Sequence, residues 1–525
     1  MSGKSRPESH VRHPAPGTQR LTPWLVTWIF AILPLLGWWL YGLFDMDEGF
    51  YGAVVAEMNR RGEWLTPYYN GHPWFEKPIL LYWLAKPSMM AFGIWVGPRL
   101  PSILATIGTY ALVAWFARRR WDDQTARWCV LVTASSILVV GVGRMMMTDA
   151  LLNVCLVGAF VFFWESLVGD RRWRLLSALF LGLSVLAKGP VGLLLFIPVA
   201  GWTLWREKDL RPAFRGWWLL GTLILAATVA TWYVPAYIVN GHEFVQKFLV
   251  EQNLNRFTGG DLAHTPPYLP GLLIYPFSLL LGMAPWSFYL WKAWPGPQPS
   301  RSARSDLEGR VPALDRFLVV WAVVPFVFFM IGKAKLPHYV LPCAVPLALL
   351  VGGYLAGRAK ENRAGPESAV RELQFPLAAC AVVAILANGA FLLYYNWGRL
   401  SGHSEVHQLA FYVRDHCQPD EAVAAYQMPR RQQDLGTGRP AIQETAHPSL
   451  VMYLDRYIDE TDNLTALLSN PRAQWVLTRR GRIRPQDIET AHKARRELSQ
   501  VDTPKTQDLY CLYYLTAAPG SRSQR

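Results

Sequence analysis

Charged residues are scarce in this chain. Asp, Glu, Lys and Arg make up 17% of its 525 residues, whereas hydrophobic residues make up 52%. An ordinary soluble domain has about 25% charged residues, so the shortage excludes a protein whose whole surface faces water. The net charge of +14 does not indicate a nucleic-acid partner, because Lys and Arg are concentrated in short loops between apolar stretches.

Cysteine is also scarce, and no long internal repeat is present. Four of the six cysteines fall in apolar stretches, namely Cys129, Cys155, Cys343 and Cys380. The other two, Cys417 and Cys511, lie in the more polar C-terminal part, where an oxidising compartment would allow one disulfide. Their spacing does not show whether they are close enough to pair, so a disulfide and two free thiols both stay open.

Long apolar runs are abundant instead. A helix needs about 20 apolar residues to cross a bilayer, and runs of this kind predict a polytopic α-helical membrane protein with about 11–13 transmembrane helices. The clearest spans lie near residues 22–44, 98–117, 128–142, 149–168, 175–187, 189–205, 216–238, 268–291, 317–332, 338–357 and 374–396.

The apolar stretch 79–93 fits poorly as a further span. It is short, Lys86 and Pro87 interrupt it, and crossing the membrane there would invert every later loop. We therefore expect an in-plane or re-entrant helix beside the outer leaflet.

The distribution of basic residues predicts the orientation. With the N-terminus in the cytoplasm, the inside segments carry 24 Lys and Arg and the outside loops carry 10, as the positive-inside rule requires. The predicted order is a disordered cytoplasmic segment, 1–21, a transmembrane domain, 22–396, and an exported domain, 397–525. In the last part, apolar runs at 422–426, 474–478 and 510–515 occur with helical patterns near 406–416 and 487–498. This predicts a small α/β domain on the outer, periplasmic face of a bacterial inner membrane.

Two charged motifs on the outer side are the strongest functional signals. Asp47-Glu48 follows the first span, and Glu76-Lys77-Pro78 follows about 30 residues later. Charges at the end of a hydrophobic span are costly near lipid and usually persist for chemistry or for binding a charged head group. Asp47 could instead simply cap a helix over residues 48–60. Pro78 suits the first turn of a following helix, whose start would favour an anionic head group together with Lys77.

Further ionisable residues fall on the same side. They are Asp45, Arg144, Asp149, Lys188, Arg256, Asp261, His264, Lys333, Lys335 and His338. Lys333 and Lys335 occupy one tight turn beside His338 and form a cluster suited to phosphate, although snorkelling would explain either lysine by itself. His264 could join Glu76 in ligating a divalent metal such as zinc, or could be a solvated loop histidine.

These residues belong to a series of motifs that resembles a known family over residues 22–358. The motifs are Asp47-Glu48-x-x-Tyr51, Gly62-x-Trp64-x-x-Pro67, Asn70-Gly71, Phe75-Glu76-Lys77-Pro78, Thr148-Asp149, Ala187-Lys188-Gly189, Glu251-x-x-x-x-Arg256-Phe257, His264 and Gly332-Lys-x-Lys-Leu-Pro-x-Tyr339-x-Leu-Pro342. They resemble the bacterial lipid A 4-amino-4-deoxy-L-arabinose transferases, which are related to the protein O-mannosyltransferases. The C-terminal part matches in position and size only.

The resemblance implies a GT-C fold and a polyprenyl-phosphate-linked sugar donor. It implies a catalytic role for the acidic pair Asp47 and Glu48, metal ligation by Glu76 and His264, donor-phosphate binding by Lys77 and Arg256, and acceptor-side positions for Asp149 and Tyr339. Lys333 and Lys335 are further phosphate-binding candidates. In one departure, Phe50 stands where aminoarabinose transferases typically carry an arginine, which leaves the donor sugar open.

We therefore predict an inverting glycosyltransferase. It would move a sugar from a polyprenyl-phosphate donor to lipid A or another envelope glycolipid at the outer membrane face. The alternative within the fold is glycosylation of exported proteins. A transporter is a different class, but it would place its charges near the bilayer midplane, often with paired repeats. Here the charges gather at one face.

Overall fold

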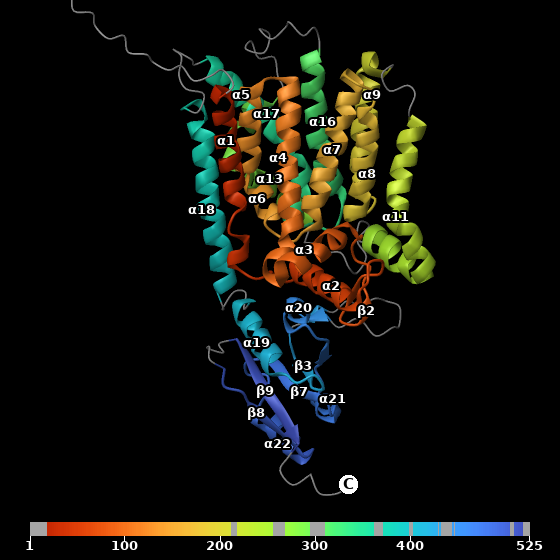
Figure 1. Ribbon diagram of the computed structural model, residues 1–525, viewed down its shortest axis with the longest axis vertical. Helices are drawn as coiled ribbons and strands as arrows, with labels where there is room; N and C mark the ends of the chain where they lie inside the picture. Colours follow the sequence, from red (N-terminus) through yellow and green to blue (C-terminus); the bar gives the residue numbers. More distant parts are fainter. Residues whose placement is uncertain are drawn as a thin grey trace, which may run out of the picture.

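The computed structural model comprises a long helical bundle and a smaller mixed domain at one end (Figure 1). The structure describes residues 18–211, 218–255, 268–294, 310–361, 371–397, 403–428, 430–431, 444–445, 447–503 and 509–517. The bundle contains α1 (Thr18–Ile32), α4 (Leu100–Arg120), α5 (Asp123–Ala134), α6 (Ile137–Gly143), α7 (Thr148–Val168), α8 (Trp173–Lys188), α9 (Val191–Arg206), α11 (Trp218–Phe244), α13 (Tyr268–Gly282), α16 (Arg310–Ile331), α17 (Leu341–Glu361) and α18 (Gln374–Asn396).

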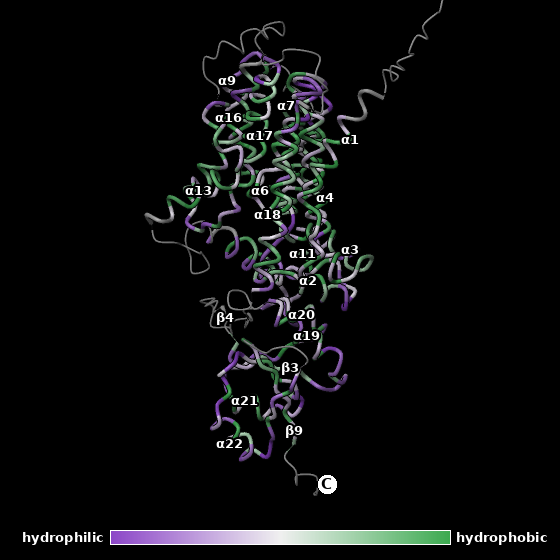
Figure 2. The backbone as a smooth tube through the Cα atoms, turned by 90° about the vertical axis from the view of Figure 1, so that its left-hand side faces the viewer, coloured by the Kyte–Doolittle hydropathy of each residue, from purple (hydrophilic) through white to green (hydrophobic). Residues whose placement is uncertain are grey.

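Within the described ranges, seven helices are long and apolar enough to cross a membrane, or nine if two bent helix pairs each count as one span. Both bent pairs were predicted as single spans: α5 with α6, bent by 64°, and residues 271–293, bent by 98°. With the 16-residue helices α8 and α9, these segments match the eleven predicted spans. The prediction of a polytopic helical membrane protein is confirmed. Hydrophobic residues follow the bundle, and hydrophilic ones are frequent in the domain beyond it (Figure 2).

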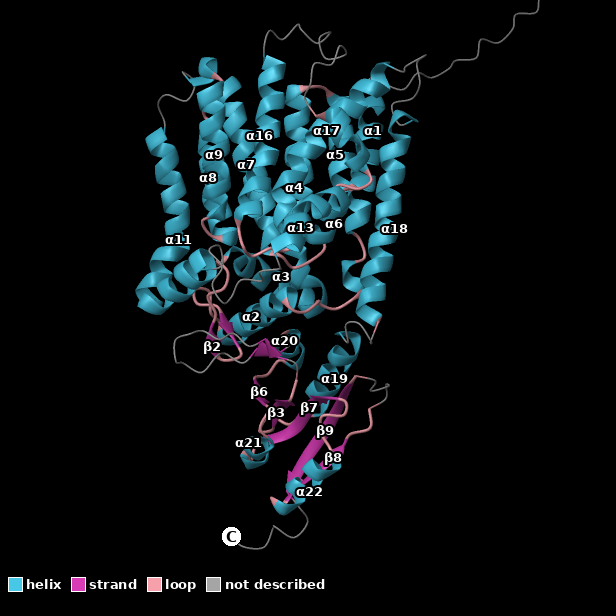
Figure 3. Cartoon of the chain, turned by 180° about the vertical axis from the view of Figure 1, so that it is seen from behind, coloured by secondary structure: helices cyan, strands magenta, loops and turns pink. Residues whose placement is uncertain are grey.

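Two helices lie across the end of the bundle that faces the smaller domain (Figures 1 and 3). They are α2 (Asp47–Arg61) and α3 (Leu80–Val96), joined by the hairpin of β1 (Tyr68–Tyr69) and β2 (His72–Pro73). α3 is the helix expected in the membrane plane, and it kinks at Gly93, whose φ of 74° suits glycine. Lys86 is buried within α3, because its ammonium donates to the carbonyls of Met58 and Glu63 at the end of α2.

The smaller domain is built on a five-stranded mixed sheet of order β6-β3-β7-β9-β8. Its elements are α19 (His403–His416), β3 (Ala422–Tyr426), α20 (Ser449–Leu454), β6 (Ile458–Thr461), α21 (Leu464–Ser469), β7 (Ala473–Arg479), α22 (Pro485–Lys493), β8 (Arg496–Gln500) and β9 (Tyr510–Ala517). β3 pairs in parallel with β6 and β7, whereas β9 is antiparallel to β7 and β8. The three apolar runs form β3, β7 and β9, so the predicted α/β domain is confirmed.

The structure corrects one prediction for this domain, the end of a helix, and answers one question that the sequence left open, the pairing of two cysteines. The helical pattern over 487–498 ends at Lys493, because Arg495 has a φ of 58° and the chain then enters β8. Cys417 and Cys511 are free thiols: the first follows α19, and the second lies on β9. Burial raises the pKa of Cys417 to about 11 and also raises that of Cys511, so both are protonated thiols near neutral pH.

The two parts of the chain share one hydrophobic core. Phe50, Val54 and Met58 of α2 belong to the same buried cluster as Val451 and Met452 of α20. Asn70, in the turn between β1 and β2, exchanges two hydrogen bonds of 2.9 Å with the backbone of Ile458 on β6. The smaller domain is therefore docked on the helices that carry the predicted site.

Candidate active site at the membrane surface

Asp47 is the first residue of α2 and does not cap it. The N-cap position is Met46, and no side chain makes a capping hydrogen bond there. The helix-cap interpretation of Asp47 is therefore wrong, although a carboxylate in the first turn still interacts favourably with the helix dipole. The residue is half-buried, and its charge acts on His338, which lies in another outer loop.

Glu48 points the other way, into the protein. Its carboxylate is fully buried and accepts two hydrogen bonds of 2.7 Å from Arg99, one of 2.6 Å from the Met146 N–H and one of 2.9 Å from the Phe44 N–H. All four donors hold it away from any substrate. These contacts correct its assignment beside Asp47 as a catalytic residue: Glu48 fixes the start of α2 to the bundle.

Asp149 anchors a second group of polar side chains. It is the second residue of α7, and its Oδ1 lies 2.5 Å from the Lys188 ammonium at the end of α8. His338 Nε2 lies 3.8 Å from the other carboxylate oxygen, and Lys188 also sits 4.4 Å above the ring of Tyr339. Residues from three outer loops, predicted to meet, are therefore brought together. Asp149 also interacts electrostatically with Lys77, which connects this group to the first outer loop.

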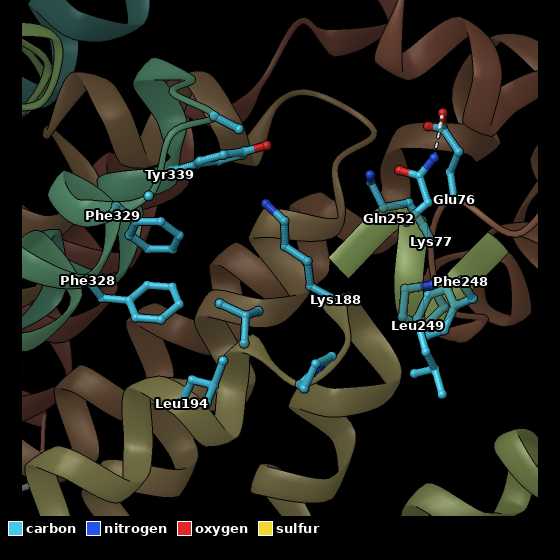
Figure 4. Close-up of a pocket in the computed structure, with 15 residues that line it drawn as sticks. Glu76, Lys77, Lys188, Leu194, Phe248, Leu249, Gln252, Phe328, Phe329 and Tyr339 are labelled. Atoms are coloured by element: carbon cyan, nitrogen blue, oxygen red, sulfur yellow. Dashed lines mark hydrogen bonds between the residues drawn. The ribbon is translucent and has the colours of Figure 1, made fainter. Parts of the chain in front are cut away.

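A cavity of about 370 Å³ opens beside this group. Glu76, Lys77, Lys188 and Tyr339 line its polar part, and apolar side chains line the rest: Leu194, Phe248, Leu249, Phe328 and Phe329. Figure 4 shows Lys188 between a wall formed by Tyr339, Phe328 and Phe329 and a second wall that carries Phe248, Leu249 and Gln252. An ammonium pair beside an aromatic and aliphatic wall suits a ligand with an anionic head and an apolar tail.

Two tyrosines complete the surroundings of Asp47. Burial raises the pKa of Tyr51 well above its ordinary value, and the negative charges of Asp47, Glu76 and Asp149 act in the same direction. Tyr51 is therefore a protonated hydroxyl. Tyr82 on α3 is buried, and its hydroxyl has no hydrogen-bond partner among the described residues. Because unsatisfied buried hydroxyls are uncommon, Tyr82 is a candidate for contact with a bound polar group.

Two predicted phosphate ligands do not line the cavity. The Lys335 ammonium donates to the carbonyls of Met330 and Gly332, at 2.7 and 2.8 Å, and so closes the C-terminus of α16. This contact corrects its assignment as a phosphate ligand. Lys333 is exposed and is absent from the cavity lining. Arg256 and His264 lie outside the described residues, so the metal pair of Glu76 with His264 stays a prediction. Glu76 Oε1 lies 3.5 Å from the amide of Gln252.

Phe50 occupies a hydrophobic position. It is buried, stacks on Trp74 with ring centroids 4.9 Å apart and meets Tyr69 edge-on at the same distance. The residue that replaces the family's arginine thus serves the core of the outer loops. Lys188 is a cation in the cavity to which the sequence assigned no role, although it appeared in the motif Ala187-Lys188-Gly189.

A buried cluster that was not predicted from the sequence lies where the smaller domain meets α2. It contains Asp45, just before α2, together with His403, His407 and His447. Burial raises the pKa of Asp45, but the hydrogen bond and charge of His447 and the charges of the other two histidines outweigh it, and the net pKa is lowered. Burial lowers the pKa of His407 to about 3. The three histidines are separated in sequence and form no motif.

Comparisons with known proteins agree with this architecture. The family model for dolichyl-phosphate-mannose-protein mannosyltransferase matches residues 76–233. In fold, the chain is similar to ArnT from Cupriavidus metallidurans bound to undecaprenyl phosphate, with a TM-score of 0.69, 18% identity and coverage of 95% of this chain and 98% of that one. It is also similar to an Archaeoglobus fulgidus oligosaccharyltransferase, with a TM-score of 0.52, 12% identity and coverage of 88% and 69%. The fold is that of the GT-C membrane glycosyltransferases.

Relatives in sequence identify the family of glycosyltransferases to which the chain belongs. An undecaprenyl phosphate-α-4-amino-4-deoxy-L-arabinose arabinosyl transferase of Shewanella sediminis is 30% identical over 396 residues, which cover 73% of this chain and 67% of that one. A relative of the same name from Edwardsiella ictaluri is 31% identical over 344 residues. The match covers 64% of this chain but only 59% of that relative's length. The chain belongs to the family of these arabinosyl transferases.

Proposed function

We propose that the protein transfers a sugar from a polyprenyl-phosphate donor to lipid A or another envelope glycolipid. The observation that carries the proposal is the cavity, whose lining combines Lys77 and Lys188 with an apolar wall. Asp149 pairs with Lys188, and the charges of Asp47 and Asp149 both act on His338. A polyprenyl phosphate has the matching form, a phosphate head on a long hydrocarbon chain. The named relatives use a donor of this kind.

The proposed chemistry follows from the charges. An acceptor oxygen attacks the anomeric carbon from the face opposite the phosphate, the bond from that carbon to the phosphate oxygen breaks, and the lipid phosphate leaves with the bonding electrons. Inversion results. Lys77 and Lys188 stabilise the charge that develops on the leaving phosphate, which is commonly a large part of catalysis. Arg256 remains a further proposed phosphate ligand.

Asp47 is the proposed catalytic carboxylate. It takes the proton of an acceptor hydroxyl, or orients the acceptor where this is a phosphate that is already anionic. Lys188 contacts both the carboxylate of Asp149 and the ring of Tyr339. Asp149 and Tyr339 are the proposed acceptor side. A metal held by Glu76 and His264 would add charge at the phosphate. No step of the proposal depends on it.

The donor sugar is proposed to be an aminopentose, as in the names of the relatives. Phe50 stands where the family typically has an arginine, and Lys188 is a cation proposed to hold the donor phosphate in this chain. The proposed location is a bacterial inner membrane, with residues 1–21 in the cytoplasm, residues 22–396 in the membrane and residues 397–525 in the periplasm. In that orientation, the cavity opens toward the donor pool of the outer leaflet.

The test compares lipid A from a host that lacks its own transferase, with the wild-type gene or with Asp47→Asn. Mass spectrometry should show an added sugar with the wild type and none with the variant, because the amide keeps the shape of Asp47 but removes its charge. Asp455→Asn is the matched control, since this exposed carboxylate lies in the smaller domain. Unmodified lipid A with both the wild type and the control, together with sugar on exported proteins, would favour the protein-glycosylating alternative.

A further inference from the structure

A second, separate site lies where the smaller domain meets the bundle. Asp45 stands in the loop before α2, His403 begins α19, and His447 lies in the turn before α20. His447 Nδ1 is 3.0 Å and His403 Nε2 is 3.8 Å from the same carboxylate oxygen, Asp45 Oδ2. One ligand atom from each residue lies within 4.8 Å of the other two.

We infer that Asp45, His403 and His447 bind a divalent transition metal, with zinc the best match, and that this ion fastens the smaller domain to the start of α2. Imidazole nitrogens and a carboxylate oxygen are ordinary zinc ligands. Zinc bonds of about 2.0–2.1 Å place tetrahedral ligand atoms about 3.4 Å apart. The separations of 3.0 and 3.8 Å fall on either side of that spacing.

Charge supports the assignment. The Asp45 side chain is 2% exposed, and no Lys or Arg in the described part of the chain pairs with it. Its partners are the Ser449 N–H and hydroxyl, at 2.9 and 2.8 Å, and the imidazoles. A buried carboxylate without a cation is costly. A divalent ion held by the two imidazoles and the carboxylate would supply that charge.

The surrounding contacts fit a ligated state. His447 Nε2 lies 2.6 Å from the Tyr510 hydroxyl, an outer contact that orients a metal-binding imidazole. Its proton moves from Nδ1 to Nε2 when Nδ1 takes the metal, and the hydrogen bond to Tyr510 reverses. His403 Nε2 already presents a lone pair, because it accepts from the Asp45 N–H at 2.8 Å. The ion displaces that hydrogen bond and the one between His447 Nδ1 and Asp45 Oδ2.

The site is distinct from the proposed metal pair of Glu76 with His264, and its consequence is structural. Asp45 is two residues before Asp47. An ion at this site therefore holds the catalytic segment against His403, which is 358 residues away in sequence. Metal ligation between distant segments couples binding to folding. The inference does not depend on which sugar or acceptor is used.

The test is the metal content of the full-length protein, purified in detergent without chelator and equilibrated with buffered zinc. Wild type should hold about one equivalent at this site, in addition to any metal at Glu76 and His264. Asp45→Asn, His403→Gln and His447→Gln should each lower the occupancy of this site about tenfold or more, as for a metal site that loses a ligand. His407→Gln is the matched control. It is equally buried in the same cluster but bonds Tyr395 and Ser449, and it should keep the metal.

Two further measurements separate metal loss from misfolding. Cobalt-loaded wild type should show visible bands of a tetrahedral nitrogen–oxygen site, and these should vanish in His447→Gln protein that still elutes as a monodisperse species. Glu76→Gln can remove only metal bound at the separate pair of Glu76 and His264, so it should leave the cobalt bands of the Asp45 site in place. Zinc-free wild type after equilibration would overturn the inference, as would cobalt bands that are lost from Glu76→Gln but kept in His447→Gln. Failure here would leave the glycosyl-transfer proposal untouched, because that proposal rests on Asp47 and the cavity.

Discussion

The substitution Glu48→Gln separates a structural carboxylate from a catalytic one. Glu48 accepts two hydrogen bonds from Arg99 and two from backbone N–H groups, and both members of the ion pair are fully buried. Glutamine keeps the size but removes the charge, and its NH₂ group would face the donors of Arg99. Breaking one side of a buried ion pair costs about 3–5 kcal/mol, because the other charge is left uncompensated.

The expected result is a less stable protein. A loss of that size corresponds to a melting temperature lower by roughly 3–5 °C for a chain of this length. Thermal unfolding in detergent, at one fixed scan rate, measures it. Transfer activity is measured on the folded fraction, with a polyprenyl-phosphate sugar and an acceptor glycolipid, and Asp47→Asn serves as the opposite case: normal melting with transfer abolished.

A double substitution sharpens the test. Glu48→Met with Arg99→Met removes both charges, and apolar replacement of a buried ion pair is often close to neutral for stability. The double variant should therefore be more stable than Glu48→Gln and recover part of the transfer activity. It should stay below the wild type, because backbone groups that Glu48 and Arg99 bonded lose their partners. Normal melting of Glu48→Gln with complete loss of transfer would refute this reasoning and return Glu48 to the catalytic residues.

Three other outcomes are expected. Lys77→Ala should weaken the binding of a polyprenyl-phosphate analogue by about tenfold in a titration, because one charge-assisted contact is lost, whereas Lys77→Arg should keep most of the affinity. Equal binding by the wild type and both variants would make Lys77 an interfacial lysine. Hydrogen bonds from Tyr514, the Gln418 N–H and Trp475 outweigh burial and lower the pKa of Glu421. This carboxylate therefore stabilises the folded state above its unfolded pKa, and the stabilisation is lost as pH falls through the acid range. Acid titration of unfolding should show a smaller decline in Glu421→Gln, and identical curves would contradict the assignment. A reporter that fluoresces only in the cytoplasm should stay dark when fused after Arg525 and should fluoresce when the chain is cut after Glu361, at the end of α17; the reverse pattern would invert the topology.

The structure also changes how the first outer loop is understood. The sequence presented Asp47 and Glu48 as one acidic pair, but consecutive residues at a helix start point in different directions. Asp47 faces the loops that carry His338, and Glu48 faces Arg99 in the bundle. Adjacent carboxylates therefore differ in role because their surroundings differ.

The sequence by itself determined the membrane architecture. A bilayer imposes a length and an apolar composition on each span independently of its neighbours, so spans could be counted from local composition. The same applies to α2, α3 and the strands β3, β7 and β9, whose patterns are local. The grouping of Asp47, Lys77, Asp149, Lys188 and Tyr339 at one membrane face followed from span counting, since each alternate loop returns to the same side.

Only the tertiary structure decided which of these side chains meet. The ammonium of Lys335 donates to carbonyls at the C-terminal end of α16, whereas Lys188 lines the cavity. Composition does not encode where each of these side chains points. Arg99 and Glu48 are 51 residues apart, and Asp45 and His447 are 402 residues apart. Their contacts depend on how helices pack and how the smaller domain docks. Such pairings are set by the shape of the folded chain, because side chains distant in sequence leave no local periodicity when they come together.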